Sequence, residues 1–526
     1  MTIREEITQI LAPFAEGTAF SVVFGDGKEQ GEYASNLALV RGKTERKNPK
    51  EVAEDIKKNI EGENIFNSVE VAGPGFLNFV INPSELLKHA CVLEGAKAKE
   101  PKNVSIEFVS ANPTGPLHIG NVRGGPIGDL LARIFERQGH KVTREYLNND
   151  AGAQITKFGA SLWHWYLQEC GEESTLEEVQ YSGEYIKDLV KEAKKVLGDK
   201  LAENEEKGTA ALLAFALEKS VAENFETLKA IGITYDKITS DSDLLQGDTQ
   251  EVLKELEQKN LIIEKEDAKW FAPSSEFMPD PAVVVKGDGT PIYFANDIAY
   301  HKKKFAANDI VIDILGEGHH GHIPKLKAIA ETYDFPLENF YVVVHGQVSL
   351  IKDGKPYTMS KRMGNFVAAQ EVLDMVGVDA LRYFFLSYDP RSGMKFDIDL
   401  AQERSKQNPV YYIQYAHARA ERLFEKSEMK PGEIASEDIV EVHTKQLLLR
   451  IAEFEEVIED TSRDFGVNRV AHYAYELARD FTSFYEHVRI LDEVENTASR
   501  LGIVLLAQNA LRDALDLMGI SAPKEM

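Results

Sequence analysis

The segment around residues 104–135 places the strongest constraint on the fold, because two different periodicities meet there at a loop rich in Gly and Pro. Apolar residues from Val104 to Phe108 alternate with polar ones, which is the period of a β-strand. Apolar residues from Ile127 to Phe135 recur at the spacing of an amphipathic helix. The loop between them reads "SANPTGPLHIGN". A strand, loop and helix in this order aim backbone N–H groups and the positive end of a helix dipole at one point, where phosphate binds well.

Composition limits what kind of protein can carry this unit. The chain has 526 residues, of which 43% are hydrophobic, so it is long enough for three or more domains. It has no run of about 18 apolar residues, and its acidic first residues do not read as a targeting leader, so we expect a cytoplasmic protein without a membrane partner. Its two cysteines, Cys91 and Cys170, form no CxxC pair and predict neither a disulfide framework nor structural zinc.

The net charge of −26 argues against general affinity for nucleic acids, because phosphate binding depends on cations. We therefore expect no DNA partner. An RNA partner would have to dock specifically, on locally basic surfaces.

The chain divides into three regions by pattern. Residues 1–100 read as a compact α/β unit that ends in a charged linker, and residues 101–366 alternate strands with helices, as a doubly wound parallel sheet requires. Within the second region, residues 165–230 are charged and helix-periodic and predict a helical insertion. Strand signals nearly vanish after residue 366, so residues 367–526 predict a helical bundle.

A second glycine-rich loop is compatible with a different function. Residues 316–321 read G-E-G-H-H-G between a strand and a helix, the context of a dinucleotide fingerprint. The next strand, however, ends in His345 and Gly346 without an acidic residue for a ribose, which disfavours a dehydrogenase. The adjacent His319 and His320 point apart on any regular backbone and lack acidic or Cys partners at ligand spacing, so a polar pocket is favoured over a metal site.

A third loop is cationic. The stretch "SLIKDGKPYTMSKRMGN" at 349–365 places Lys355, Lys361 and Arg362 behind a tight Asp-Gly turn. Such a loop can close on a triphosphate and stabilise charge on departing pyrophosphate, although the loop taken alone favours a solvated basic turn.

The first and third loops together resemble the two signature motifs of class I aminoacyl-tRNA synthetases. The segments "SANPTGPLHIGNVRG", "YLNNDAGAQI", "KGDGTPIYFANDIAYHKKKF", "NPVYYIQYAHAR" and "LGISAPKEM" resemble bacterial arginyl-tRNA synthetase, and the likeness covers almost the whole chain. The resemblance implies a Rossmann-type catalytic domain, an N-terminal domain that grips the corner of tRNA and a helical anticodon-binding domain. It also implies ligation of L-arginine to tRNA(Arg) with ATP and Mg²⁺, through an arginyl-adenylate, by a monomer whose arginine activation requires bound tRNA.

Site residues follow from the same resemblance. His118 and Lys361 match the catalytic positions, whereas Asn121 and Thr358 stand where the family has His and Lys. The ATP-binding positions are Pro113, Thr114, Gly115, His118, Gly120, Asn121, Met359, Ser360, Lys361 and Arg362. The arginine-binding positions are Glu107, Asn112, Tyr293, Asp297 and His319. The tRNA-binding positions are Tyr33, Asn36, Phe76, Phe79, Tyr412, Tyr415 and Arg419.

Three alternatives remain open from the residues. A nucleotidyltransferase on the same fold shares the His-x-Gly-His loop but needs no anticodon bundle. A synthetase homologue that only binds tRNA would not need His118, Lys361, Glu107 and Asp297 intact. Cysteinyl-tRNA synthetase is disfavoured because two cysteines cannot supply its zinc ligands.

Overall fold

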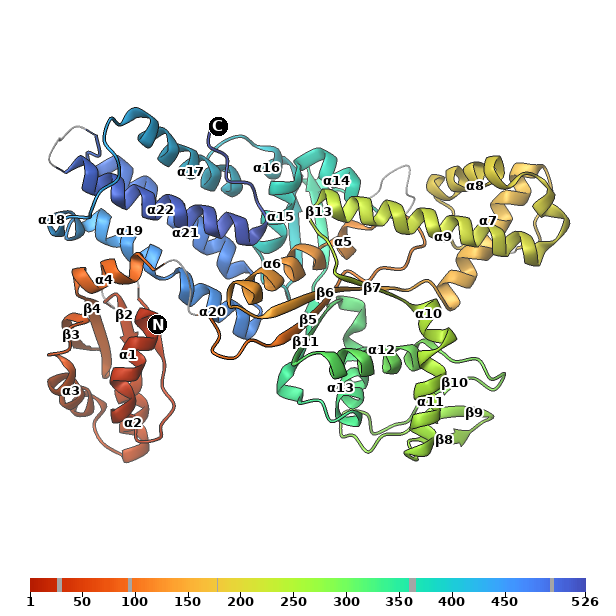
Figure 1. The fold of residues 1–526 in the computed structure, drawn as a ribbon, viewed down its shortest axis with the longest axis horizontal. Coiled ribbons are helices and arrows are strands. Elements are labelled where there is room, and N and C mark those ends of the chain that lie inside the picture. The colour runs from red at the N-terminus through yellow and green to blue at the C-terminus, as the bar shows by residue number, and fades with distance from the viewer. Residues whose placement is uncertain (26–30, 93–96, 177, 359–365, 492–495) are drawn as a thin grey trace. The chain divides into compact units, whose positions relative to one another are not determined.

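A computed structural model describes residues 1–25, 31–92, 97–176, 178–358, 366–491 and 496–526 (Figure 1). The chain forms two compact units. One combines residues 1–97 with residues 403–526, and the other is continuous from residue 98 to residue 402. Among the described residues, no helix combines the length and the apolarity needed to cross a bilayer.

A five-stranded sheet forms the centre of the unit 98–402. Its order is β12-β11-β5-β6-β7, and every neighbouring pair is parallel. The strands are β5 (Asn103–Phe108), β6 (Lys141–Asn148), β7 (Lys237–Ser240), β11 (Ile310–Gly316) and β12 (Phe340–His345). The expected doubly wound sheet is therefore confirmed. Its carboxyl edge, where β5 and β11 end side by side, is the edge at which ligands bind in such folds.

Helices cover both faces of this sheet. Figure 1 shows α6 (Gly124–Arg137) on one side of the strands, and α12 (Tyr293–Ala307) with α13 (Ile323–Thr332) on the other. The apolar stripe predicted from Ile127 to Phe135 is the buried face of α6. The first signature loop lies between β5 and α6 and contains the short helix α5 (Ile119–Val122).

The helical insertion is longer than its expected range. It comprises α7 (Ala153–Cys170), α8 (Glu184–Leu197) and α9 (Glu205–Ala230), which pack around a core that includes Trp163 and Tyr166. Between β7 and α12 follow α10 (Asp241–Gln246), α11 (Asp248–Gln258) and the antiparallel strands β8 (Ile262–Lys265), β9 (Ala268–Phe271) and β10 (Ala282–Val285).

We expected the helical bundle to begin directly after the second signature loop, at residue 367, but short strands are found there first. The short strand β15 (Met394–Asp397) pairs in parallel with β13 (Val348–Lys352), which also pairs with β14 (Lys355–Pro356). Three helices follow the loop: α14 (Ala369–Val376), α15 (Val378–Leu386) and α16 (Ile398–Gln402). The helix α16 packs against β13, and α14 and α15 pack against α16. Residues 367–402 therefore belong to the unit 98–402. The sequence did not predict this, because a four-residue strand leaves almost no periodic signal.

The other unit contains an antiparallel sheet and a helical bundle. The sheet has the order β1-β2-β4-β3. Its region consists of α1 (Ile3–Leu11), β1 (Val22–Phe24), β2 (Tyr33–Ser35), α2 (Leu37–Glu45), α3 (Pro49–Ile60), β3 (Phe66–Ala72), β4 (Phe76–Ile81) and α4 (Pro83–Ala90). The bundle consists of α17 (Pro409–Lys426), α18 (Ser436–Ile439), α19 (Val442–Ala452), α20 (Phe454–Asp464), α21 (Asn468–His487) and α22 (Thr497–Met518).

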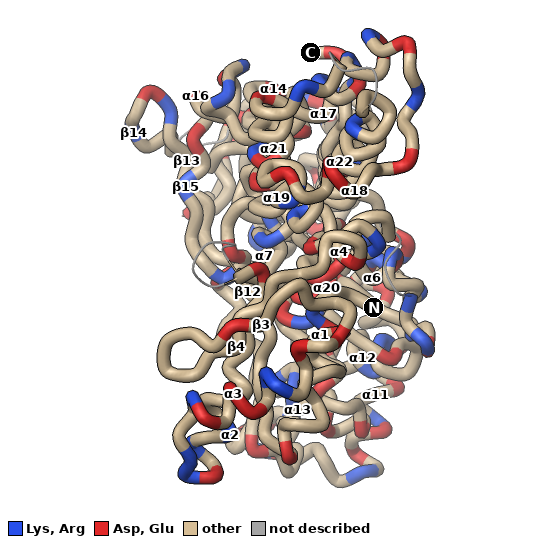
Figure 2. The backbone as a smooth tube through the Cα atoms, turned by 90° about the vertical axis from the view of Figure 1, so that its left-hand side faces the viewer, with Lys and Arg blue, Asp and Glu red and all other residues tan. Residues whose placement is uncertain are grey.

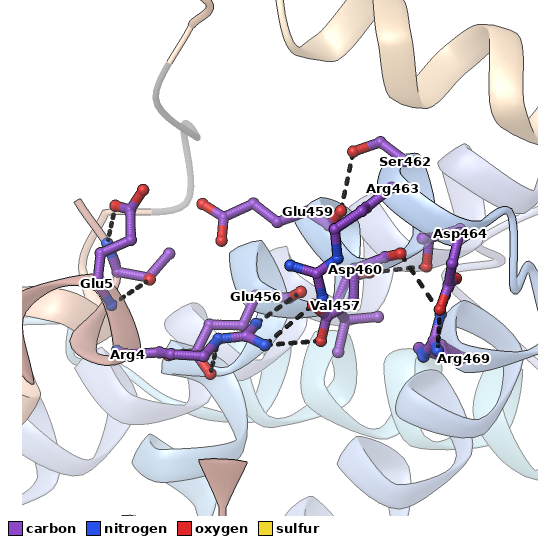
Figure 3. Close-up of polar contacts among 12 residues, drawn as sticks. Arg4, Glu5, Glu456, Val457, Glu459, Asp460, Ser462, Arg463, Asp464 and Arg469 are labelled. Carbon is purple, nitrogen blue, oxygen red and sulfur yellow. Dashed lines mark hydrogen bonds and ion pairs between the residues drawn. The ribbon is translucent and has the colours of Figure 1, made fainter. Parts of the chain in front are cut away.

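A charged cluster joins α1 to α20 within this unit (Figure 3). Arg4 donates from Nη1 to both carboxylate oxygens of Asp460, at 2.9 and 2.8 Å, and its backbone N–H donates to Glu456. The Tyr33 hydroxyl donates to the same Glu456 carboxylate at 2.9 Å. Elsewhere, Figure 2 shows acidic and basic residues interspersed along the backbone, as on α3, whose sequence carries both kinds.

Candidate active site

The loop after β5 presents His118 at the start of α5. The His118 Nδ1 accepts a hydrogen bond from the Gly120 N–H at 2.8 Å, so the side chain caps the helix. Burial lowers the pKa of His118, which favours the neutral ring with its proton on Nε2. The ring can therefore donate from Nε2 to a ligand oxygen.

Backbone hydrogen bonds join this loop to the segment that follows the second signature loop. Ile119 N–H donates to Val367 at 3.1 Å, and Ala369 N–H donates to Leu117 at 2.8 Å. His118 and Ala368 form an isolated antiparallel bridge. The two signature loops, about 240 residues apart in the sequence, are therefore tied to one another at their bases.

His118 borders a cavity of about 590 Å³, here named the His118 cavity. Its walls come from the loop after β5, from the loop after β11 and from the end of β12. The residues that matter below are Asn112, His118, Gly120, Asn121, Gln154, His319 and His345. Burial lowers the pKa of His345 to about 4, so this ring adds a neutral group to the wall.

A second cavity of about 510 Å³ adjoins the first and shares Asn112, Gln154 and His319 with it. Its lining carries four carboxylates, at Glu107, Asp241, Asp297 and Asp313, and we name it the acidic cavity. Both volumes suit small-molecule ligands.

Two of these carboxylates lie where a ligand cation can meet them. Asp297, on α12, pairs with His322 Nε2 at 3.0 Å. Asp241 begins α10, is buried, and accepts from Asn296 Nδ2 at 3.3 Å. Burial raises the pKa of Asp241 to about 7, and the nearby negative charges of Asp297, Asp150 and Glu107 act in the same direction. A bound cation would relieve this repulsion, so the acidic cavity is suited to a positively charged group.

The other two carboxylates are engaged by a buried ammonium group. Lys304 Nζ lies 2.8 Å from Glu107 Oε2 and 2.5 Å from Asp313 Oδ1, and its side chain has no exposed surface. His301 completes the arrangement, with Nε2 at 3.0 Å from Asp313 Oδ2 and Nδ1 at 2.8 Å from the Asp297 carbonyl. Both ring nitrogens face acceptors, which favours the doubly protonated form, and the hydrogen bond to Asp313 raises the pKa of His301 despite its burial.

The structure gathers the residues expected to bind arginine. Glu107, Asn112, Tyr293, Asp297 and His319 all border the acidic cavity. The ring of Tyr293 lies against Gly152, which has φ +86°, and a Cβ atom there would stand 2.5 Å from that ring. Gly152 therefore makes room for Tyr293.

The residues expected to bind ATP are only partly gathered. Gly120, Asn121 and His118 border the His118 cavity, while Thr114 and Gly115 border an adjacent cavity of about 280 Å³ beside Tyr185. Pro113 is buried. Met359, Ser360, Lys361 and Arg362 lie outside the described residues, and Thr358, at their edge, is exposed.

Two residues expected to contact tRNA are in the core instead. Tyr33 and Phe79 have no exposed surface, since Tyr33 donates to Glu456 and Phe79 stacks on Phe66 with centroids 4.9 Å apart. Neither can offer a ring face to a base, so these two expectations are wrong. Phe76 is 39% exposed and Asn36 is half-buried, which keeps both as candidates.

One of the three residues expected on a common face of α17 is replaced by its neighbour in the sequence. Tyr415 stacks on Tyr411 with centroids 6.3 Å apart, and the Arg419 guanidinium lies 4.8 Å from the Tyr415 ring and 4.5 Å from the Tyr485 ring. Tyr412 points instead toward Tyr475, at 5.5 Å. The column of stacked groups therefore contains Tyr411 in the place expected for Tyr412.

Sequence reasoning missed Asp241, Lys304, His301 and Asp313. Helical periodicity could have found two of them, because Tyr293, Asp297, His301 and Lys304 recur on one face of α12. Asp313 carries a weaker signal, as a lone acid in the apolar strand "IVIDIL". Asp241 carries none, because an Asp at a helix start is usually a cap.

Comparisons with known families agree along the whole chain. The description "Arginyl tRNA synthetase N terminal domain" matches residues 1–81, "tRNA synthetases class I (R), catalytic domain" matches residues 83–383, and "DALR anticodon binding domain" matches residues 413–526. The arginine–tRNA ligase of Thermotoga petrophila is 37% identical over an alignment that covers 100% of this chain and 99% of the relative. That of Desulforamulus reducens is 39% identical over an alignment that covers 95% of this chain and 92% of the relative.

Solved structures show the same fold. The arginyl-tRNA synthetase of Thermus thermophilus superposes with a TM-score of 0.80 at 21% identity, covering 100% of this chain and 99% of that one. With the relatives above, this shows that the chain belongs to the arginyl-tRNA synthetase family of class I and is an ATP-dependent enzyme that ligates arginine to tRNA(Arg).

Proposed function

We propose that the acidic cavity binds the arginine substrate and that the His118 cavity binds ATP. The observation that carries this assignment is the shared wall at Asn112, Gln154 and His319, which separates a site suited to a cation from a site suited to phosphate. Asp241 and Asp297 receive the guanidinium group, which is planar and permanently charged. Glu107, Asn112, Tyr293 and His319 line the same site and complete the selection against lysine by geometry.

The arrangement favours a reaction by positioning. The arginine carboxylate attacks the α-phosphorus of ATP, a new P–O bond forms, and the bond to pyrophosphate breaks. The attacking carboxylate carries no proton, so no general base is needed. His118 donates from Nε2 to a phosphate oxygen, Gly120 lets the nucleotide approach, and Asn121 adds a neutral amide donor. The Lys361 ammonium group stabilises the departing pyrophosphate, and Lys355 or Arg362 supplies the charge missing at Thr358.

Magnesium enters with ATP. No three His, Cys, Asp or Glu side chains come together as metal ligands in the described part of the chain, so phosphate oxygens would hold most of the ion. Mg²⁺ supplies charge neutralisation on the triphosphate when bound.

The proposed tRNA contacts come from the sheet region and from the helical bundle of the unit formed by residues 1–97 and 403–526. Phe76 and Asn36 contact the corner of the tRNA, and Tyr411, Tyr415 and Arg419 offer stacking surfaces to anticodon bases. We assign residues 1–97 to tRNA-corner binding, residues 98–402 to catalysis and residues 403–526 to anticodon binding, in a cytoplasmic monomer.

Exchange of labelled pyrophosphate into ATP tests the site assignment. Arginine-dependent exchange should fall strongly in Asp297→Asn, through a higher KM for arginine with an unchanged KM for ATP, since only the guanidinium loses a charged partner. Exchange is measured with and without tRNA(Arg), and with lysine in place of arginine, to test the requirement for tRNA and the specificity. An arginine KM that stays at the wild-type value in Asp297→Asn contradicts the assignment.

A further inference from the structure

The ammonium group of Lys304 is fully buried beneath the acidic cavity. Lys304 is the inward-facing residue of α12 two turns beyond Asp297, and its Nζ lies 2.8 Å from Glu107 Oε2 and 2.5 Å from Asp313 Oδ1. The Tyr300 ring covers it, with its centroid 4.8 Å from Nζ. Lys304 therefore cannot contact a ligand, but it contacts a carboxylate that borders the cavity.

Glu107 is held from two directions. Its Oε2 accepts from Lys304, and its Oε1 accepts from the Ser110 hydroxyl at 2.8 Å. The side chain is 5% exposed, so few other orientations are open to it. The remaining lone pairs of the carboxylate are those that can face a ligand in the acidic cavity.

Lys304 also divides the negative charge of the cavity into two layers. Lys304 and His301 form ion pairs with the first layer, Glu107 and Asp313, and offset its negative charge. The second layer, Asp241 and Asp297, has no lysine or arginine among the ion pairs of the described residues. Without Lys304, Glu107 would lose the ammonium group that fixes its Oε2, and Asp313 would keep only His301 as a charged partner. An apolar residue would fill the same space with less desolvation, so a buried ion pair alone does not account for a lysine at this position.

We propose that Lys304 is a positioning residue for arginine recognition: its ammonium group holds the Glu107 carboxylate in one orientation, ready to accept from a cationic nitrogen of the substrate. This inference rests on the proposed assignment of the acidic cavity to arginine. It adds a residue that never touches arginine to those that determine its binding.

Steady-state aminoacylation by the full-length enzyme tests the proposal in three variants. Lys304→Met keeps the volume of the side chain and removes the charge. Asp313→Asn keeps the contact between Lys304 and Glu107. The double variant Lys304→Met, Asp313→Asn removes the ammonium group and one of its two partner carboxylates. Only Glu107 is then left without the ammonium group, so the double variant should fold more readily than Lys304→Met. Lys303→Met is the matched control. The Lys303 side chain neighbours Lys304 in the sequence, is 53% exposed and pairs with Asp248.

We expect the KM for arginine to rise by about 30-fold in Lys304→Met and in the double variant, because Glu107 loses its charged partner. The kcat and the KM for ATP should stay close to wild type, since only ground-state binding of arginine is affected. Lys303→Met should retain the wild-type KM for arginine. Asp313→Asn itself removes a carboxylate from the lining of the acidic cavity, so it is the reference for the double variant, whose KM for arginine should exceed that of Asp313→Asn by a similar factor.

Two outcomes overturn the proposal. One is a KM for arginine in the double variant that equals the KM of Asp313→Asn. The other is a parallel loss of kcat and of both substrate affinities, which indicates general disruption of the fold. Asp297→Asn distinguishes a failure of the Lys304 proposal from a failure of the assignment of the acidic cavity to arginine. If the cavity binds arginine, Asp297→Asn raises the KM for arginine whatever the role of Lys304.

Discussion

If the acidic cavity binds arginine as proposed, Asp241 should make arginine binding dependent on pH. Its carboxyl group has a pKa raised to about 7, first by burial and then by the charges of Asp297, Asp150 and Glu107. Only the ionised form attracts a guanidinium group strongly, so protonation below pH 7 weakens binding. We expect the KM for arginine to rise about tenfold per pH unit as the pH falls below that pKa. Steady-state kinetics between pH 6 and pH 8.5, at saturating ATP and tRNA, measure the change.

Substitution of Asp241 isolates its contribution. Asp241→Asn should raise the KM for arginine at pH 8 and remove most of its pH dependence. Asp243→Asn, two residues along the same helix and exposed, is the matched control and should keep the wild-type profile. An equally steep profile in Asp241→Asn would assign the titration to another group.

His118 caps α5, and the proposed function gives it a catalytic role as well; two substitutions separate the two roles. Asn at this position can still cap α5 by accepting from the Gly120 N–H, but its amide does not reach as far as the imidazole Nε2. His118→Asn should therefore lower the rate of adenylate formation by about 10²–10³-fold, as does the loss of one donor to a developing charge. His118→Ala should lose the cap as well, and about 1 kcal/mol of stability with it.

Rapid-quench measurement of adenylate formation, together with thermal unfolding, checks both halves of this prediction. If His118→Asn retained wild-type chemistry, His118 would be a helix cap only.

At the scale of elements, a single proline substitution at residue 369 tests whether the hydrogen bonds between the bases of the two signature loops position His118. Ala369 is the first residue of α14, where proline is tolerated, and Ala368 before it has φ −69° and ψ 143°, which suits a residue that precedes proline. Ala369→Pro removes the N–H that donates to Leu117 and adds ring atoms at a fully buried position. We expect pyrophosphate exchange to slow by about tenfold, because a small displacement of the loop misplaces His118 relative to ATP.

Ala369→Gly retains the N–H and serves as the control for that substitution. Far-UV circular dichroism of both variants shows whether α14 persists. Full exchange activity in Ala369→Pro would mean that the contact between the loops does not position His118.

Elements with strong periodicity could be predicted from the sequence, and short or tertiary features could not. The strand from Val104 to Phe108 and the stripe on α6 are strictly periodic, and both are confirmed. The strand β15 spans four residues and owes its existence to pairing with β13, which is distant in the sequence. The burial of Tyr33 likewise depends on Glu456, 423 residues away, and no local pattern records such a contact.

At the scale of the whole molecule, the same limit applies to the site. The carboxylates Glu107 and Asp297 could be placed by resemblance, because each lies in a recognisable segment. The partition of charge by Lys304 could not, since it joins β5, β11 and α12 through side-chain distances. Composition predicted an acidic molecule but not where its charges are compensated.

The charged cluster between α1 and α20 should make the attachment of the N-terminal region dependent on pH (Figure 3). Glu456 faces Arg4 and Tyr33, with Glu453 nearby, and burial raises its pKa to about 7. Glu459 has a pKa raised to about 7 by burial, Glu5 and Asp460, against the attraction of Arg4. Because the folded pKa lies above that of the unfolded chain, stability is fully present at low pH and is lost as the pH rises through 7.

Amide hydrogen exchange in α1 measures this attachment directly. We expect the free energy of opening of α1 to fall by about 2 kcal/mol between pH 5 and pH 8, after correction for intrinsic exchange rates. Glu456→Gln can still accept from Tyr33 and Arg4 but cannot ionise, so it should flatten most of this dependence. Glu437→Gln, an exposed carboxylate in α18, should leave the dependence unchanged. A wild-type opening energy that is constant or rises with pH would mean that Arg4 compensates both carboxylates fully, because an ion pair of that kind would stabilise the attachment at high pH instead.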